Sequence, residues 1–299
     1  MKKLAALFLA ALVSLFSSCS MKGMATNVIG KVASQGISAV EGEEDVLFAR
    51  ESAPPLIKTL EVLRSGNPRD YRSLVLLSQS YGQFAFGFLE EDMLRHPPES
   101  TEYREARDRA DLFYRRGREY GIAALSVRGM TKAFKSPFPE FKKAVGKLGR
   151  KDIPALLWTS FNWANYLNLH LDEPAVIADL ARIEAMVDRI LELDPGFYCS
   201  SARSLKGVML SMKPKMLGGK PEEARAYFEK AMEASPGYLM TKVLFSQYFA
   251  RAQQDSALFR SSLEEVLGSD ATAMPEQRLA NELAKRRAKL LLGMQKKLF

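Results

Sequence analysis

The stretch PEEARAYFEKAMEASPGYL, residues 221–239, decides the fold of the chain. Ala224, Phe228 and Ala231 lie four and then three residues apart, so they share one face of a helix. Pro236 follows five residues after Ala231. It ends the helix because proline has no backbone N–H and disfavours helical geometry in the residue before it. The stretch therefore predicts one amphipathic helix followed by a sharp turn.

The same spacing recurs along the chain, as apolar-x₃-apolar-x₂-apolar, often followed by x₄-Pro. Two further copies keep the proline and two lack it: Leu56-Leu60-Leu63-Pro68, Ile183-Val187-Ile190-Pro195, Ala110-Tyr114-Gly117 and Phe259-Leu263-Val266. This pattern is typical of the second helix of a tetratricopeptide repeat, in which a small residue lets two helices cross closely. The sequence therefore predicts an all-α chain of irregular tetratricopeptide-like repeats, curled into a compact bundle of about ten to twelve helices.

Three segments indicate where the repeats are irregular. His96 to Ser100 is rich in proline and predicts a loop, and Ser136 to Asp152 predicts a turn-rich insert. Pro275 to Phe299 predicts the helix that closes the bundle, because proline suits the first helical position and Glu276 suits the first turn.

The N-terminus has the features of an export signal. Lys2 and Lys3 precede an apolar run, Leu4 to Val13, that is too short to span a membrane comfortably. Small residues stand directly before Cys19, as at a lipoprotein cleavage site. An ordinary secretory signal with a chance cysteine is the alternative. We expect Cys19 to carry lipid that anchors the chain to a membrane facing the periplasm, the outer membrane rather than the inner.

These features divide the chain into three parts. We expect a lipoprotein signal peptide at residues 1–18, a lipidated tether at residues 19–44 and the tetratricopeptide-like α-helical domain at residues 45–299. The net charge of +8 is expected to reflect solvated helix faces. Nucleic acid is not an expected partner of an exported protein.

Gly218-Gly219-Lys220 invites comparison with a phosphate-binding loop. A Walker loop needs a hydroxyl residue after the lysine and a strand before the glycines. Here Pro221 follows Lys220 and begins a helix, so we expect the glycines to end one helical segment and free the chain for the next. Lys220 then stands at the capping position, where its side chain cannot accept backbone N–H bonds.

Catalytic and metal-binding patterns are missing from the sequence. His96 and His170 are the two histidines, and they lie too far apart in sequence to make a His-x₃-His pair. Cys199 is the one cysteine besides Cys19, and we expect it to be a small buried side chain rather than a nucleophile. We therefore expect no enzyme activity, no catalytic residue, no metal site and no cofactor.

A polar and aromatic stripe within residues 155–174 is the candidate ligand site. Trp158, Asn162 and Tyr166 lie four residues apart and share a helix face. Together with the neighbouring Trp163 and Asn165, they combine apolar area with amide and hydroxyl groups, as small-molecule sites do. The alternative is a repeat face whose asparagines bond to neighbouring backbone.

Several segments together resemble one family, the T-component (TatT) of tripartite ATP-independent periplasmic (TRAP) transporters. They are EGEEDVLFARESAPPLIKTLEVLRSGNP (41–68), YGQFAFGFLEEDM (81–93), LFYRRGREYGIAAL (112–125), LLWTSFNWANYLNL (156–169), LGGKPEEARAYFEKA (217–231), YLMTKVLFSQYFARAQQDSALFRSSLEEVL (238–267) and PEQRLANELAKRRAKLLL (275–292). The resemblance spans nearly the whole chain after the signal peptide. One departure is Lys220, where similar sequences tend to have aspartate.

The resemblance implies a lipid-anchored scaffold that faces the periplasm and partners a TRAP substrate-binding protein. It also implies a homo-oligomer, with a trimer as one arrangement, and a small organic ligand that is hydrophobic or carboxylated. The competing hypothesis is a lipid-tethered tetratricopeptide adaptor for envelope or outer-membrane protein assembly, which binds extended or helical peptides.

Overall fold

The structure is a computed structural model that describes residues 36–171, 179–213 and 219–299. The predicted signal peptide, Cys19 and Gly218 lie outside these residues. Within them the chain is all α-helical, which confirms the predicted fold class. Their twelve α-helices are α2 Val46–Ser65, α3 Tyr71–Phe84, α4 Glu90–Arg95, α5 Thr101–Leu125, α6 Phe138–Val145, α7 Ile153–Asn168, α9 Leu180–Leu193, α10 Phe197–Met212, α11 Pro221–Ala234, α12 Met240–Leu244, α13 Ser256–Gly268 and α14 Arg278–Leu298.

Shorter helical turns connect several of these helices. Three are π-helical: η1 Ala85–Leu89, η2 Ser126–Met130 and η6 Phe245–Ala250. Four are 3₁₀ turns: η3 Ala133–Lys135, η4 Arg150–Asp152, η7 Ala271–Ala273 and η8 Pro275–Gln277. Residues 36–41 are also helical and precede α2. The predicted turn-rich insert after Ser136 thus contains one full helix, α6, with Pro139 in its first turn.

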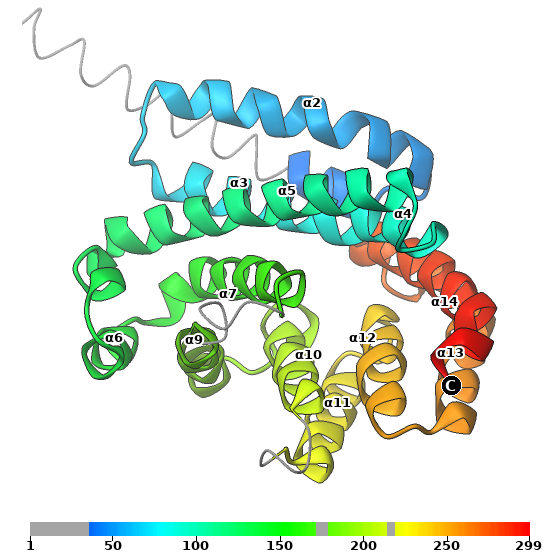
Figure 1. Ribbon diagram of the computed structural model, residues 1–299. Coiled ribbons are helices and arrows are strands. Elements are labelled where there is room, and N and C mark those ends of the chain that lie inside the picture. The colour runs from blue at the N-terminus through cyan, green and yellow to red at the C-terminus, as the bar shows by residue number, and fades with distance from the viewer. Residues whose placement is uncertain (1–35, 172–178, 214–218) are drawn as a thin grey trace, which may run out of the picture.

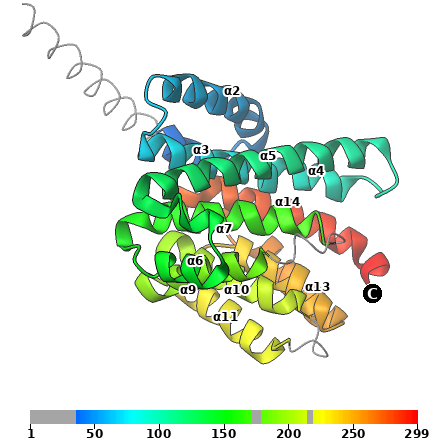
Figure 2. The same cartoon turned by 60° about the vertical axis from the view of Figure 1, so that its left-hand side comes forward.

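The helices follow a curled path that brings the two ends of the described chain together. Figure 1 shows α2, α3 and α5 on one side of α7, with α9, α10 and α11 on the other. Figure 2, turned by 60°, keeps the same order. The last helix, α14, returns to contact α2 and α4, and α13 packs along it. The segment from Pro275 therefore closes the bundle, as predicted.

The apolar triplets found in the sequence are the packing faces of their helices. Four of the five are fully buried, including Ala224, Phe228 and Ala231, which are 0% exposed. The first triplet differs because it lies on α2, at the edge of the bundle, where Leu60 is buried but Leu63 is 37% exposed. The spacing thus identified the inward faces of four helices correctly.

Four of the described α-helices, α2, α3, α5 and α13, begin with a side-chain cap. Ser100 ends the predicted proline-rich loop and caps α5 by accepting a hydrogen bond from the backbone N–H of Tyr103 at 3.1 Å. Lys220 stands before α11 without a capping bond, and its Nζ lies 3.0 Å from the Glu223 carboxylate instead. The helix thus begins at Pro221 as predicted, with a surface ion pair in place of a cap.

None of the helices in the described ranges combines the length and the apolar character needed to cross a bilayer.

Candidate functional site

A cavity of about 160 Å³ lies where the two ends of the described chain meet, partly enclosed by nine helical elements and the segment 36–41. It is comparable in size to an engineered cavity of about 150 Å³ that binds benzene. Most lining side chains are apolar. They include residues of α2, α3, α7, α10 and α14, among them Ile57, Phe84, Leu157, Phe161, Leu205 and Leu283.

Two of the π-helical turns shape this cavity. The turn η1 contributes Phe86 and Phe88 to its wall, and η6 contributes Tyr248. A π-helical turn adds one residue to a helix and rotates the side chains that follow, which is why such turns are frequent at functional sites. Here they point aromatic rings from two distant helices toward one space.

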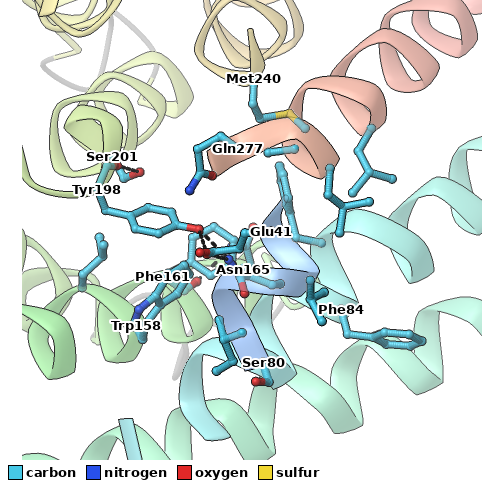
Figure 3. A pocket seen from close by; sticks show the side chains of 18 of the residues that line it. Glu41, Ser80, Phe84, Trp158, Phe161, Asn165, Tyr198, Ser201, Met240 and Gln277 are labelled. Carbon is cyan, nitrogen blue, oxygen red and sulfur yellow. Dashed lines mark hydrogen bonds between the residues drawn. The ribbon is translucent and has the colours of Figure 1, made fainter. Parts of the chain in front are cut away.

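A polar cluster occupies one side of the cavity, and Glu41 is its centre. Figure 3 shows the Glu41 carboxylate reaching into the middle of the cavity, with the Tyr198 ring extended toward it. Three donors meet the same carboxylate oxygen, Oε1. The hydroxyl of Tyr198 lies at 2.5 Å, and the Nε2 atoms of Gln79 and Gln83 both lie at 3.0 Å. Gln83 Nε2 also lies 2.6 Å from the Tyr198 hydroxyl. Glu41 is the one charged side chain among the described residues that line the cavity.

The backbone that carries Tyr198 is strained. Tyr198, Cys199 and Ser200 form three consecutive left-handed residues, with φ angles of 45°, 55° and 58°. A non-glycine residue in this region costs about 1–3 kcal/mol, and such strain tends to accumulate at binding and active sites. The turn aims the Tyr198 ring into the cavity, where it forms a T-shaped pair with the Trp158 ring at a centroid distance of 5.0 Å.

The hydroxyls of Tyr198 and Tyr248 and the nearby Cys199 thiol keep their protons at neutral pH. Burial, and then the charge of Glu41, hold the pKa of the Tyr198 hydroxyl well above its usual value. Burial also raises the pKa of Tyr248 to about 12 and that of the Cys199 thiol to about 11. Tyr198 therefore donates a hydrogen bond, and Cys199 is a half-buried neutral thiol rather than a nucleophile.

Gln277 adds an unsatisfied group to the same wall. Its side chain is 5% exposed and lines the cavity, yet its Oε1 has no hydrogen-bond partner within the described part of the chain. Buried amide oxygens are usually satisfied, so an exception beside a cavity calls for an explanation. A donor group on a bound molecule would supply the missing partner.

The five predicted ligand-binding residues divide into two groups. Trp158 and Asn165 line the cavity, as Figure 3 shows. Asn165 also donates from Nδ2 to the backbone oxygen of Phe161 at 2.9 Å. This is the kind of bond expected from the alternative interpretation, in which the asparagines bond to neighbouring backbone.

The other three predicted residues lie away from the cavity. Asn162 is fully buried and donates from Nδ2 to the backbone oxygens of Trp158 at 2.7 Å and Ser78 at 2.9 Å. Trp163 donates to Asp179 at 3.2 Å on the α9 side. Tyr166 stacks against the Arg118 guanidinium, 4.5 Å from its ring centroid. A stripe of side chains four residues apart on α7 thus spans two different environments.

Sequence reasoning missed most of the polar cluster. Gln79, Gln83, Tyr198 and Gln277 come from three distant segments, and Glu41 fell within the expected tether. One signal was present: Glu41 begins the first of the segments that carry the family resemblance.

Within the described residues, no three histidine, cysteine or acidic side chains gather closely enough to hold a metal ion. His170, one of the two histidines, lies 2.6 Å from the Asp111 carboxylate, which is an interaction between α5 and the end of α7.

Comparison with known proteins gives one clear result. The model of the family described as TRAP transporter T-component (TAtT) matches residues 42–299, which covers nearly all of the described helices. No curated protein matches the sequence.

Proposed function

The chain belongs to the TRAP transporter T-component family, and from this premise we propose that it docks the substrate-binding protein of such a transporter and holds a small organic ligand in its cavity. Membership of the family gives the accessory role in TRAP transport. The docking and the ligand are the proposal, and the cavity between segment 36–41 and the closing helix α14 is the observation that carries it.

The composition of the cavity supports a small, largely apolar ligand. Pockets for small molecules combine hydrophobic walls with a few polar groups that fix orientation. Here aromatic and aliphatic side chains form the walls, and Tyr198, Gln83, Asn165 and Gln277 supply hydrogen-bonding groups. Proteins of this family are not enzymes, and the protonated Tyr198 and Cys199 fit a binding role.

The outer face of α2 supports contact with another protein. Phe48 and Val62 are 58% and 64% exposed, and Pro55 between them is also exposed. These three residues lie seven apart, so they form one apolar stripe along the helix. We propose this stripe as the docking surface for the binding protein, because exposed apolar side chains in contiguous patches mark interaction sites.

The proposal that the chain is attached to a membrane rests on the sequence alone. We propose that the lipid on Cys19 tethers the helical domain to a membrane facing the periplasm, the outer membrane rather than the inner. We also propose that copies of the chain associate, with a trimer as the arrangement to test by mass measurement in solution.

A capture experiment tests the proposed docking. The tagged chain is mixed with envelope extract, with and without small-molecule supplements, and its bound proteins are identified by mass spectrometry. We expect a TRAP substrate-binding protein in the wild-type sample and much less with Phe48→Ser/Val62→Ser. The matched control is Leu267→Ser, which alters an exposed leucine on α13. Recovery of outer-membrane assembly proteins, without any TRAP component, would instead favour the envelope adaptor.

A further inference from the structure

The segment 36–41 enters the cavity from the N-terminal side of the helical domain. Ile37 is 6% exposed and packs into the core formed by the first and last helices. Val40 and Glu41 then form part of the cavity wall. The segment therefore occupies space that a ligand would otherwise share, and it places a carboxylate there (Figure 3).

The three donors that hold this carboxylate belong to other elements. Gln79 and Gln83 lie one helical turn apart on α3, and Tyr198 comes from the strained turn of α10. Their donor atoms converge on one oxygen, Glu41 Oε1, at 2.5–3.0 Å. A carboxylate oxygen accepts several hydrogen bonds at once, so the arrangement has the chemistry of a carboxylate-recognition site.

All donors that hold the Glu41 carboxylate within the described ranges are neutral. None of the ion pairs formed among the described residues includes Glu41. The side chain is only partly buried, so it is able to return to water. A carboxylate that leaves the site would leave behind a set of donors, an apolar cavity and no uncompensated positive charge.

We propose that Gln79, Gln83 and Tyr198 form a carboxylate-binding site, and that Glu41 occupies it as an internal competitor. The ligand is an organic acid with a small apolar body and one carboxylate, which takes the place of the Glu41 carboxylate when it binds. This inference rests on the proposed ligand-holding function and names the chemical class of the ligand. It also gives the segment 36–41 a role, because displacement of Glu41 by ligand would loosen that segment from the cavity wall.

A strained backbone supports this assignment independently of the hydrogen bonds. Three consecutive left-handed residues are not needed to begin a helix, and they place the Tyr198 hydroxyl beside the α3 amides. The raised pKa of Tyr198 means that the hydroxyl arrives as a donor, which suits an anionic acceptor.

Binding of two matched probes tests the inference. Phenylacetate carries a carboxylate on a benzyl group, and toluene is the same body without the carboxylate. The protein is the mature chain, residues 19–299, with Cys19→Ser, which lacks both the predicted signal peptide and the predicted lipidation site. Calorimetric titration at neutral pH compares this protein with the same chain carrying Glu41→Ala, or Glu41→Ala together with Tyr198→Phe.

We expect Glu41→Ala to raise phenylacetate affinity by about tenfold beyond any change for toluene, because vacated donors then serve the ligand. Adding Tyr198→Phe should remove most of that gain while toluene affinity stays the same. Glu41→Gln keeps the size of the side chain and should give a smaller gain, which guards against an effect of cavity enlargement alone.

Three results would overturn the inference. If toluene binds but phenylacetate gains nothing from Glu41→Ala, the cavity holds ligands without a carboxylate site. If the gain persists with Tyr198→Phe, the Tyr198 hydroxyl does not donate to the ligand carboxylate and the assigned site is wrong. If neither probe binds any folded variant, the inference fails together with the proposed ligand-holding function.

Discussion

Glu90 and Glu41 are two inward-facing carboxylates of the same bundle, and they are held in opposite ways. Glu90, on α4, is 7% exposed, and one of its oxygens lies 2.6 Å from Arg287 Nη2. Its other oxygen accepts a hydrogen bond from the Tyr114 hydroxyl at 2.5 Å. Arg287 in turn donates to Gln247 at 2.9 Å and lies over the Phe86 ring. Glu41, by contrast, has three neutral donors and pairs with no cation among the described residues.

The difference indicates which of the two carboxylates is required for the fold. A buried ion pair becomes strongly destabilising when one partner is removed, because the remaining charge has no compensation. Glu90 and Arg287 therefore bind α4 to α14 and close the curl of the chain. Glu41 has no charged partner in the described ranges, which is why we propose that its site exchanges one carboxylate for another.

Two asparagines of α7 differ in a related way, because one is tightly packed and the other lines the cavity. Asn162 fits against Gly82 and Gly117, where a Cβ atom would come within 2.7 and 2.2 Å of its Oδ1. Asn165, one turn on, faces the cavity. One side of α7 is closely packed against α3 and α5, and the other side borders the cavity.

The largest expected effect comes from breaking the ion pair of Glu90 and Arg287. Arg287→Met keeps the length of the side chain but leaves Glu90 buried without a cation, so the free energy of unfolding should fall by about 3–5 kcal/mol. Urea denaturation followed by circular dichroism measures the change.

The matched control for this prediction is the double variant Arg287→Met/Glu90→Gln. It removes both charges and should recover most of the lost stability. A double variant as unstable as the single one would mean that the arginine acts through packing on Phe86 rather than through charge.

A smaller loss is expected on the closely packed side of α7. Gly117→Ala places a methyl group against Asn162 between three packed helices, which should cost about 1–3 kcal/mol because the interior has no room to relax. Gly293→Ala is the control, since a Cβ there meets nothing within 4 Å and alanine favours the helix. Equal melting temperatures for the two variants would contradict the close packing.

Periodicity predicted the filled regions well. The helical class, the inward faces of four helices, the start of α11 at Pro221 and the closing segment from Pro275 follow from spacing that repeats along the chain. Such spacing reports which residues share a helix face, and a face that packs against a neighbour is what the bundle needs most. The Asn162 stripe shows the limit, because one face of α7 passes from packed interior to cavity within one turn.

The cavity could not be predicted by the same means. Its polar cluster joins residues 41, 79, 83, 198 and 277, and no local pattern relates residues so far apart in sequence. The left-handed turn at Tyr198 and the π-helical turns η1 and η6 also break the regular helical period from which helix faces are predicted. A cavity cannot be read from a sequence, because the apolar residues that line it are of the same types as those that pack in the core.

Glu61 has both a cationic partner and neutral donors, so its partners are intermediate between those of Glu90 and Glu41. It predicts that the stability of the fold depends on pH. Partial burial raises its pKa, but hydrogen bonds from Lys58, Tyr81 and Tyr120 outweigh it and lower the pKa from 4.5 to about 2. A lowered pKa means that its contribution is complete above about pH 4.5 and is lost as the pH falls toward 2. Because the group is partly exposed, the loss should be about 1 kcal/mol or less.

Melting temperatures between pH 6 and pH 2.5 test this contribution. Glu61→Gln keeps an acceptor for the two tyrosine hydroxyls but cannot titrate, so its melting temperature should fall less steeply with acid than that of the wild type. Parallel curves would assign the acid sensitivity to other carboxylates.

The smallest effect is expected at Glu41, and its size decides how far the contrast with Glu90 holds. Glu41→Gln retains an oxygen that accepts from Gln79, Gln83 and Tyr198 and removes only the charge. Because no cation is left unpaired, the free energy of unfolding should change by less than about 1 kcal/mol. Urea denaturation under the conditions used for Arg287→Met gives the comparison directly. A loss of several kcal/mol would show that the charge of Glu41 is as necessary to the fold as that of Glu90. Its donors would then hold a structural carboxylate rather than a replaceable one.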